Sequence, residues 1–241
     1  MEWTITPLCM GIIEVNKSIE MAFTGFSETL EAPCIAWLLR SGSTTVLVDA
    51  GPADPQWSLE HHRPMRREAH QYLPAALRAH GVDLESVEHV IITHLHWDHC
   101  WGVKDVPNAR VYIQREEMRY AVAPLPRDAG PYETAFGFLL MASFYDRIIP
   151  VDGDMELMPG IRMLLTPGHT PGSQCVAVNT ASGVQVIAGD LVGLYEALDS
   201  NPPHVPGIFF HLDDCYTSLK KIMTISSKIL PGHDMAVFER M

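Results

Sequence analysis

The stretch His94-Leu95-His96-Trp97-Asp98-His99 places four residues of metal-binding type within six positions. It follows the apolar run Val90-Ile91-Ile92-Thr93, whose β-branched residues predict a buried strand. Alternation along such a strand would send His94 and His96 to the same side. Three imidazoles and a carboxylate exceed what one open catalytic ion needs, so the stretch predicts two metal ions. The chemistry that two neighbouring ions imply is hydrolysis.

Three further segments carry a residue of the same type beside glycine or proline, at the end of a predicted strand. They are Thr166-Pro167-Gly168-His169, Ala188-Gly189-Asp190 and Leu230-Pro231-Gly232-His233. One histidine-rich segment by itself is also typical of a solvated loop, or of core histidines bonded to backbone. The recurrence of such residues at four places along the chain favours a metal centre instead.

In this order the four segments resemble the metallo-β-lactamase superfamily, over nearly the whole chain. The resemblance implies that one metal is held by His94, His96 and His169, the other by Asp98, His99 and His233, and that Asp190 bridges them. This ligand set suits zinc, and manganese, iron or cobalt would also bind to it. In the resembling family an Asp-x-Gly segment supports the metal site from below, so the resemblance gives Asp49 that role.

The expected fold is of the α+β class, a four-layered αββα sandwich, with residues 1–241 as one domain. Strand-rich runs recur in each half of the chain with helices between them, as two facing sheets inside two helical layers require. The predicted strands and helices include 3–13, a hairpin of 34–40 and 44–49, a helix over 67–80, the ligand strand 87–93, a strand and helix over 109–120, and a helix and strand over 213–230.

Within the superfamily, the arrangement is most similar to the N-acyl homoserine lactonase branch. The shared motifs are His-x-His-x-Asp-His, Thr-Pro-Gly-His-Thr-Pro-Gly, Asp190 and Pro-Gly-His. The resemblance implies a hydrolase of ester bonds that opens a lactone ring, with N-acyl homoserine lactones and quorum quenching as the specific case. The alternatives are hydrolysis of another lactone, of a carboxylic ester or of a thioester, as in glyoxalase II. A metal-binding protein without enzymatic activity is a further alternative.

One position departs from the lactonase branch, which usually carries a tyrosine three residues after the bridging aspartate. This chain has Gly193 there. Tyr195 lies two residues further on, and we expect it to reach the same space and, together with Asp98, to assist proton transfer.

Two segments are predicted to wall the site. Residues 121–150 are rich in proline, glycine and aromatic residues and are expected to contact substrate; the alternative is that they pack on the body of the protein or on a second subunit. Residues 195–212 follow Asp190 and could line a pocket for an acyl group, with His204 and His211 assigned to the surface.

Charge and composition exclude several other classes of protein. The net charge of −12 disfavours nucleic acid as a partner, because phosphate binding needs clustered Lys and Arg. The basic cluster of residues 61–67 is interpreted as a solvated helix face without a role. The five cysteines, including Cys100, are expected to be free thiols. No leader segment and no run of about 18 apolar residues is present, which predicts a cytoplasmic protein without membrane contact. The resemblance to the lactonase branch also predicts that the protein is a homodimer.

Overall fold

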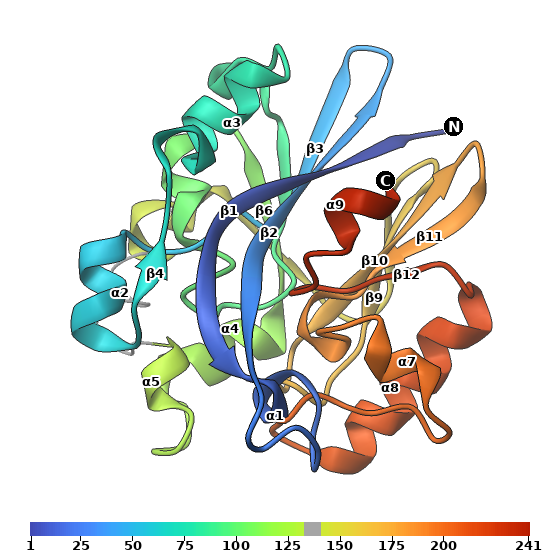
Figure 1. The fold of residues 1–241 in the computed structure, drawn as a ribbon. Coiled ribbons are helices and arrows are strands. Elements are labelled where there is room, and N and C mark those ends of the chain that lie inside the picture. The colour runs from blue at the N-terminus through green and yellow to red at the C-terminus, as the bar shows by residue number, and fades with distance from the viewer. Residues whose placement is uncertain (133–140) are drawn as a thin grey trace.

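The computed structural model describes residues 1–132 and 141–241. Two sheets pack face to face, with helices on both outer sides (Figure 1). The first sheet contains, in spatial order, β4 (Met65–Arg66), β1 (Thr4–Asn16), β2 (Thr29–Ser41), β3 (Thr44–Val48), β5 (His89–Ile91), β6 (Arg110–Gln114) and β7 (Ile148–Val151). The second contains β12 (Ile229–Leu230), β11 (Gly183–Ile187), β10 (Gln174–Thr180), β9 (Ile161–Leu165) and β8 (Met155–Met158).

The helices and short 3-10 turns connect these strands. The helices are α1 (Lys17–Glu20), α2 (Pro55–His61), α3 (Leu73–Ala79), α4 (Arg115–Val122), α5 (Ala129–Tyr132), α7 (Glu196–Asp199), α8 (Leu212–Ile225) and α9 (Val237–Arg240). The 3-10 turns are η1 (Ala69–Gln71), η2 (Leu84–Ser86), η3 (Trp101–Asp105), η4 (Tyr145–Arg147) and η5 (Gly189–Leu191). In this described part of the chain, no helix has both the length and the apolar character that crossing a bilayer requires.

Buried apolar side chains form the layers of the sandwich. In β2, Trp37 and Leu39 face the second sheet, where they pack with Ile161, Val176 and other residues of β9 and β10. Leu38, between them, faces the opposite side and joins the core under α3. The period of two along a strand explains this division, and burial on both faces explains why the central strands are apolar throughout. A third cluster lies between the second sheet and α8. The predicted αββα sandwich is therefore confirmed.

Several predicted boundaries are also confirmed, and one helix is corrected. The hairpin of β2 and β3 pairs Ser41 with Thr44 around the expected turn. The helix predicted over 67–80 is wrong in its first turns, since α3 begins only at Leu73, next to Pro74. A proline has no N–H to donate, so it fits the first turn of a helix and not the interior. The 3-10 turn η1 covers part of the missing span.

Candidate metal centre

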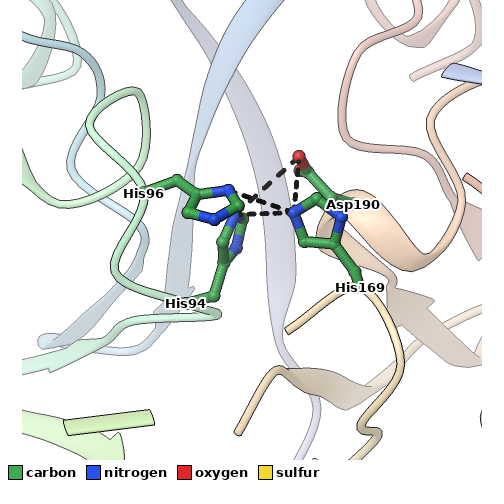
Figure 2. A group of neighbouring side chains, drawn as sticks. All are labelled: His94, His96, His169 and Asp190. Carbon is green, nitrogen blue, oxygen red and sulfur yellow. Dashed lines mark hydrogen bonds and ion pairs between the residues drawn. The ribbon is translucent and has the colours of Figure 1, made fainter. Parts of the chain in front are cut away.

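Four ligand-type side chains from three different loops converge on one point (Figure 2). The Nε2 atom of His169 lies 3.2 Å from His94 Nε2 and 3.1 Å from His96 Nδ1. The Oδ2 atom of Asp190 lies 3.4 Å from His169 Nε2 and 3.8 Å from His94 Nε2. All three imidazoles are buried. The structure therefore brings together the residues expected to hold one metal.

The second predicted ligand group lies on the other side of Asp190. Its Oδ1 atom is 3.0 Å from both His99 Nε2 and His233 Nε2. Asp98 completes this group, with Oδ2 at 3.6 Å from His99 Nε2 and 3.9 Å from His233 Nε2. Asp190 thus turns one oxygen toward each group, which is the arrangement that a bridging carboxylate needs.

The ligands come from loops that follow strands of both sheets. The first loop, after β5, carries His94, His96, Asp98 and His99. The strand that delivers them is shorter than predicted: it ends at Ile91, so the histidines approach from a loop and not by alternation along a strand. The other ligands follow β9, β11 and β12. At Gly232 an added Cβ would lie 2.7 Å from the carbonyl oxygen of Gly189, so only glycine lets the last two loops approach this closely.

The far nitrogens of the imidazoles fix how the rings are oriented. His169 Nδ1 donates to the Ile208 carbonyl at 2.7 Å, and His233 Nδ1 donates to the Pro33 carbonyl at 3.0 Å. A carbonyl only accepts, so Nδ1 carries the hydrogen in both rings, and the Nε2 lone pair faces the centre. His99 Nδ1 is held in the same way by the Asp49 carboxylate at 2.9 Å.

The donor set fits divalent metal ions. Metal–nitrogen bonds of about 2.0–2.1 Å in a tetrahedral site put two nitrogens about 3.3 Å apart, close to the separations found around His169. Within the described residues, the buried Nε2 atom of His99 lies 3.0 Å from Asp190 Oδ1 but is not in hydrogen-bond geometry with it or with any other atom. Burial raises the pKa of Asp190, but the neighbouring imidazoles outweigh it and hold that pKa well below its usual value. An ionised carboxylate among inward-facing nitrogen lone pairs is a site for cations.

Asp49 supports the loop after β5, as the resemblance implied. Its Oδ1 accepts from the Thr93 backbone N–H at 2.7 Å, and its Oδ2 accepts from the Thr93 hydroxyl at 2.8 Å as well as from His99. The backbone of Asp49 has a φ of 60°, which is rare outside glycine. Such a conformation costs on the order of 1 kcal/mol and persists where the surroundings determine it.

Glu117 is a supporting residue that the sequence analysis did not identify. It is fully buried in α4, and its Oε1 accepts from the Leu95 N–H at 2.9 Å and from the Tyr132 hydroxyl at 2.7 Å. Its Oε2 accepts from the Thr170 hydroxyl at 2.6 Å and from the Gly172 N–H at 3.2 Å. Leu95 lies between two ligands and Thr170 follows a third, so one carboxylate ties two ligand loops together. Nothing in the polar sequence of α4 marked this residue as buried.

A cavity of about 70 Å³ opens onto the ligands. Its polar lining beyond the ligands consists of Glu20, His62 and Arg63, and its apolar lining includes Ile19 and Ile208. The interpretation of residues 61–67 as a solvated helix face is therefore wrong, because α2 ends at His61 and the chain then turns His62 and Arg63 toward the cavity. The His62 ring stacks on Trp97 at 4.9 Å between centroids, and burial lowers its pKa to about 4.

Tyr195 does not reach the metal ligands. It lines a different cavity together with Lys228 and Arg240, and the Arg240 guanidinium lies 4.1 Å from the centre of its ring. The reason is local: α7 begins at Glu196, and the turn that leads into this helix directs Tyr195 away from Asp190. Of the predicted site residues, Tyr195 alone is thus placed outside the centre.

The two predicted wall segments contribute in part. The ring of Tyr132 packs on His96 at 4.7 Å between centroids, and Ile208 lines the cavity. Phe144 is buried in the core instead, whereas Phe136 and Phe138 lie outside the described residues. His211 is exposed and pairs with Asp214, as expected for a surface histidine.

The cysteine predictions are confirmed for the described residues. All five cysteines are free. Cys100 is buried and its thiol donates to the His96 carbonyl, which is a packing role.

Two ligand groups that share a carboxylate, at one edge of an αββα sandwich, define a class of metal-binding proteins, and the sequence agrees with it. The pattern of the metallo-beta-lactamase superfamily matches residues 31–233, and the chain belongs to that superfamily.

Individual relatives of this chain are named as lactonases. The N-acyl homoserine lactonase of Bacillus cereus is 27% identical over 221 residues, which cover 86% of this chain and 83% of the relative. The N-acyl homoserine lactonase AttM of Azorhizobium caulinodans is 26% identical over 224 residues, which cover 85% of this chain and 82% of the relative. Among solved structures, an N-acyl homoserine lactone hydrolase with the product N-hexanoyl-L-homoserine at its catalytic metal centre has a TM-score of 0.83 at 20% identity. It covers 100% of this chain and 97% of its own.

Proposed function

We propose that this protein is a hydrolase with two metal ions that opens lactone rings, and that N-acyl homoserine lactones are its substrates. The observation that carries the proposal is the pair of ligand groups around Asp190, with a cavity beside them. Support for the substrate comes from the relatives named N-acyl homoserine lactonase. The assigned ligands are His94, His96 and His169 on one side, Asp98, His99 and His233 on the other, and Asp190 between them.

Two divalent ions held by these ligands would supply an ionised water molecule at neutral pH and would polarise the carbonyl oxygen of an ester. The side chains keep the nitrogen lone pairs aimed at the centre, through the Nδ1 hydrogen bonds of His99, His169 and His233. Asp98 lines the cavity beside the ligands, where its carboxylate can take up and return a proton during ring opening. Tyr195 is not part of this proposal, because it lines another cavity.

The proposal also includes the identity of the metal ion and of the partner. Zinc is the ion we expect, since imidazole and carboxylate ligands in groups of this size suit it. The partner is a small lactone or ester, and the net charge of −12 disfavours nucleic acid. Residues 1–241 as one domain, a cytoplasmic location and a homodimer stay predictions.

The test is a panel of substrates offered to the metal-replete and to the chelated protein. The panel contains N-hexanoyl-L-homoserine lactone, an unsubstituted lactone, a p-nitrophenyl ester and a thioester. We expect the homoserine lactone to be hydrolysed with the highest kcat/KM, and only by the metal-replete protein. Preference for the ester or the thioester would favour the alternative hydrolases, and absence of any turnover would favour a metal-binding protein.

A pair of variants ties the activity to the site. Asp190→Asn removes the shared carboxylate and should abolish turnover with loss of bound metal. Asp213→Asn changes an exposed aspartate in the first turn of α8 and should leave both unchanged. Equal activity in the two variants would contradict the assignment of Asp190 as the bridging ligand.

A further inference from the structure

Glu20 is a buried acid in the wall of the cavity that the proposed reaction does not use. It is the last residue of α1, only 6% exposed, and it lines the cavity together with the ligands Asp98, Asp190 and His233. It makes no hydrogen bond and no ion pair with any other residue of 1–132 or 141–241. A buried carboxyl without a partner is costly, so native proteins rarely keep one without a ligand or a role.

The backbone opposite Glu20 is shaped to admit it. A Cβ added to Gly193 would lie 2.2 Å from Glu20 Oε2 and 3.1 Å from Glu20 Cβ. Any side chain at position 193 would therefore displace the carboxyl. Because Gly193 stands three residues after Asp190, the absence of a side chain there puts Glu20 beside the reacting centre.

A charge of the opposite sign lines the same cavity. Arg63 is half-buried there, and its guanidinium makes no hydrogen bond or ion pair with the described residues. A bound molecule would meet an acceptor at Glu20 and a donor at Arg63. An amide can pair with both side chains, because its N–H can donate to Glu20 and its carbonyl oxygen can accept from Arg63. Glu20 lines the same cavity as Asp98, Asp190 and His233, so an amide that reaches it would lie close to the ester carbonyl.

We propose that Glu20 is a substrate-binding residue that accepts a hydrogen bond from an amide N–H on the carbon next to the ester carbonyl. The inference rests on the proposed lactonase function and deepens it, because it names the residue that recognises the α-acylamino group of the lactone. Plain alkyl lactones offer no donor and leave the buried carboxyl unpaired. Discrimination against a substrate that lacks the matching group is large at such sites.

The experiment compares two lactones of equal length, one with an α-acylamino chain and one with an α-alkyl chain. Glu20→Ala is measured against Glu14→Ala, which changes an exposed acid of β1, six residues earlier in the chain. When the carboxyl is ionised, its hydrogen bond to the amide corresponds to a factor of roughly 10 to 100. We expect Glu20→Ala to lower kcat/KM by about that factor on the acylamino lactone, and by less than about threefold on the alkyl lactone. Metal content should equal that of the wild type.

Gly193→Ala provides a second variant that keeps the carboxyl and moves it. It should reproduce the selective loss of Glu20→Ala, and it should add little when both changes are combined. A similar loss on both lactones would overturn the proposal in favour of proton transfer or a purely structural role. Unchanged kinetics on both would overturn it too. If the wild-type protein opens neither lactone, the proposed function itself fails, which is distinguishable because the defect appears before any substitution.

Discussion

Replacing Glu117 by glutamine tests how the two ligand loops are held together. Each carboxylate oxygen of Glu117 accepts from two donors, one of them a backbone N–H: Leu95 on Oε1 and Gly172 on Oε2. Glutamine has the same shape, but one of its two positions becomes an NH₂ donor. Whichever way the amide turns, a donor then faces a backbone N–H that cannot rotate away.

The expected loss follows from these contacts. Two hydrogen bonds to a charged group are lost on one side, at about 1.5 kcal/mol each when the lower end of the usual range is taken, or about 3 kcal/mol in total. Burial raises the pKa of Glu117, but the hydrogen bonds from Leu95, Thr170 and Tyr132 oppose that effect and stabilise the ionised form. For a chain of this size, the loss corresponds to a decrease in Tm of about 6–12 °C.

The assay is unfolding of the metal-free protein, by heat and by urea, with Glu116→Gln as the control. Glu116 neighbours Glu117 in α4, but it is exposed and pairs with Arg119 at the surface. Such a pair contributes less than about 1 kcal/mol. If Glu117→Gln were no less stable than Glu116→Gln, the account of the two loops joined by one carboxylate would be refuted.

Three further predictions concern the surroundings of the centre. Asp49→Asn should weaken metal binding by about 10- to 100-fold in a chelator competition, because an amide N–H would face the Nδ1–H of His99; unchanged affinity would contradict the orienting role of Asp49. Tyr195→Phe should have a kcat within about twofold of the wild-type value, because Tyr195 lines another cavity. A large loss of kcat would show that Tyr195 takes part in the reaction. Burial raises the pKa of Glu20 from 4.5 to about 7, so its contribution to the stability of the metal-free protein is present below pH 4.5 and lost as pH rises through 7. Between pH 4.5 and 8, the free energy of unfolding in urea should therefore fall by about 3 kcal/mol more for the wild type than for Glu20→Gln. An equal decrease in both proteins would show that the pKa of Glu20 is not raised.

The proposed metal ligands could be found in the sequence because each stands in a short local motif. Histidine or aspartate beside glycine or proline, directly after an apolar run, describes a strand end that presents a side chain. The alternation of apolar residues also predicted the two sheets. What the sequence did not provide was the end of β5 at Ile91, since strand length depends on pairing with neighbours.

The residues around the ligands were not predictable in this way. Glu20, Arg63 and Glu117 are charged residues in polar stretches, where exposure is the usual outcome. Their burial arises from contacts between segments far apart in the chain, such as Glu20 with Gly193. The sequence does hold one usable signal, the glycine in place of a side chain at position 193. It indicates that another group occupies the vacant space, but not which group.

The error at Tyr195 has a similar origin. A displacement of two residues along an extended chain would keep a side chain on the same face. The chain instead turns into α7 directly after Tyr195, so the ring packs under Arg240. The position of the Tyr195 side chain is therefore set by where α7 begins, and the number of residues between Asp190 and Tyr195 does not predict it.

Metal content measured together with turnover tests the central claim most directly. The protein is stripped with a chelator and titrated with zinc, while bound metal per chain and hydrolysis of N-hexanoyl-L-homoserine lactone are followed in the same samples. We predict that activity rises to its maximum as bound zinc approaches two ions per chain. Full activity with one ion or none would contradict a centre built from two ligand groups around Asp190.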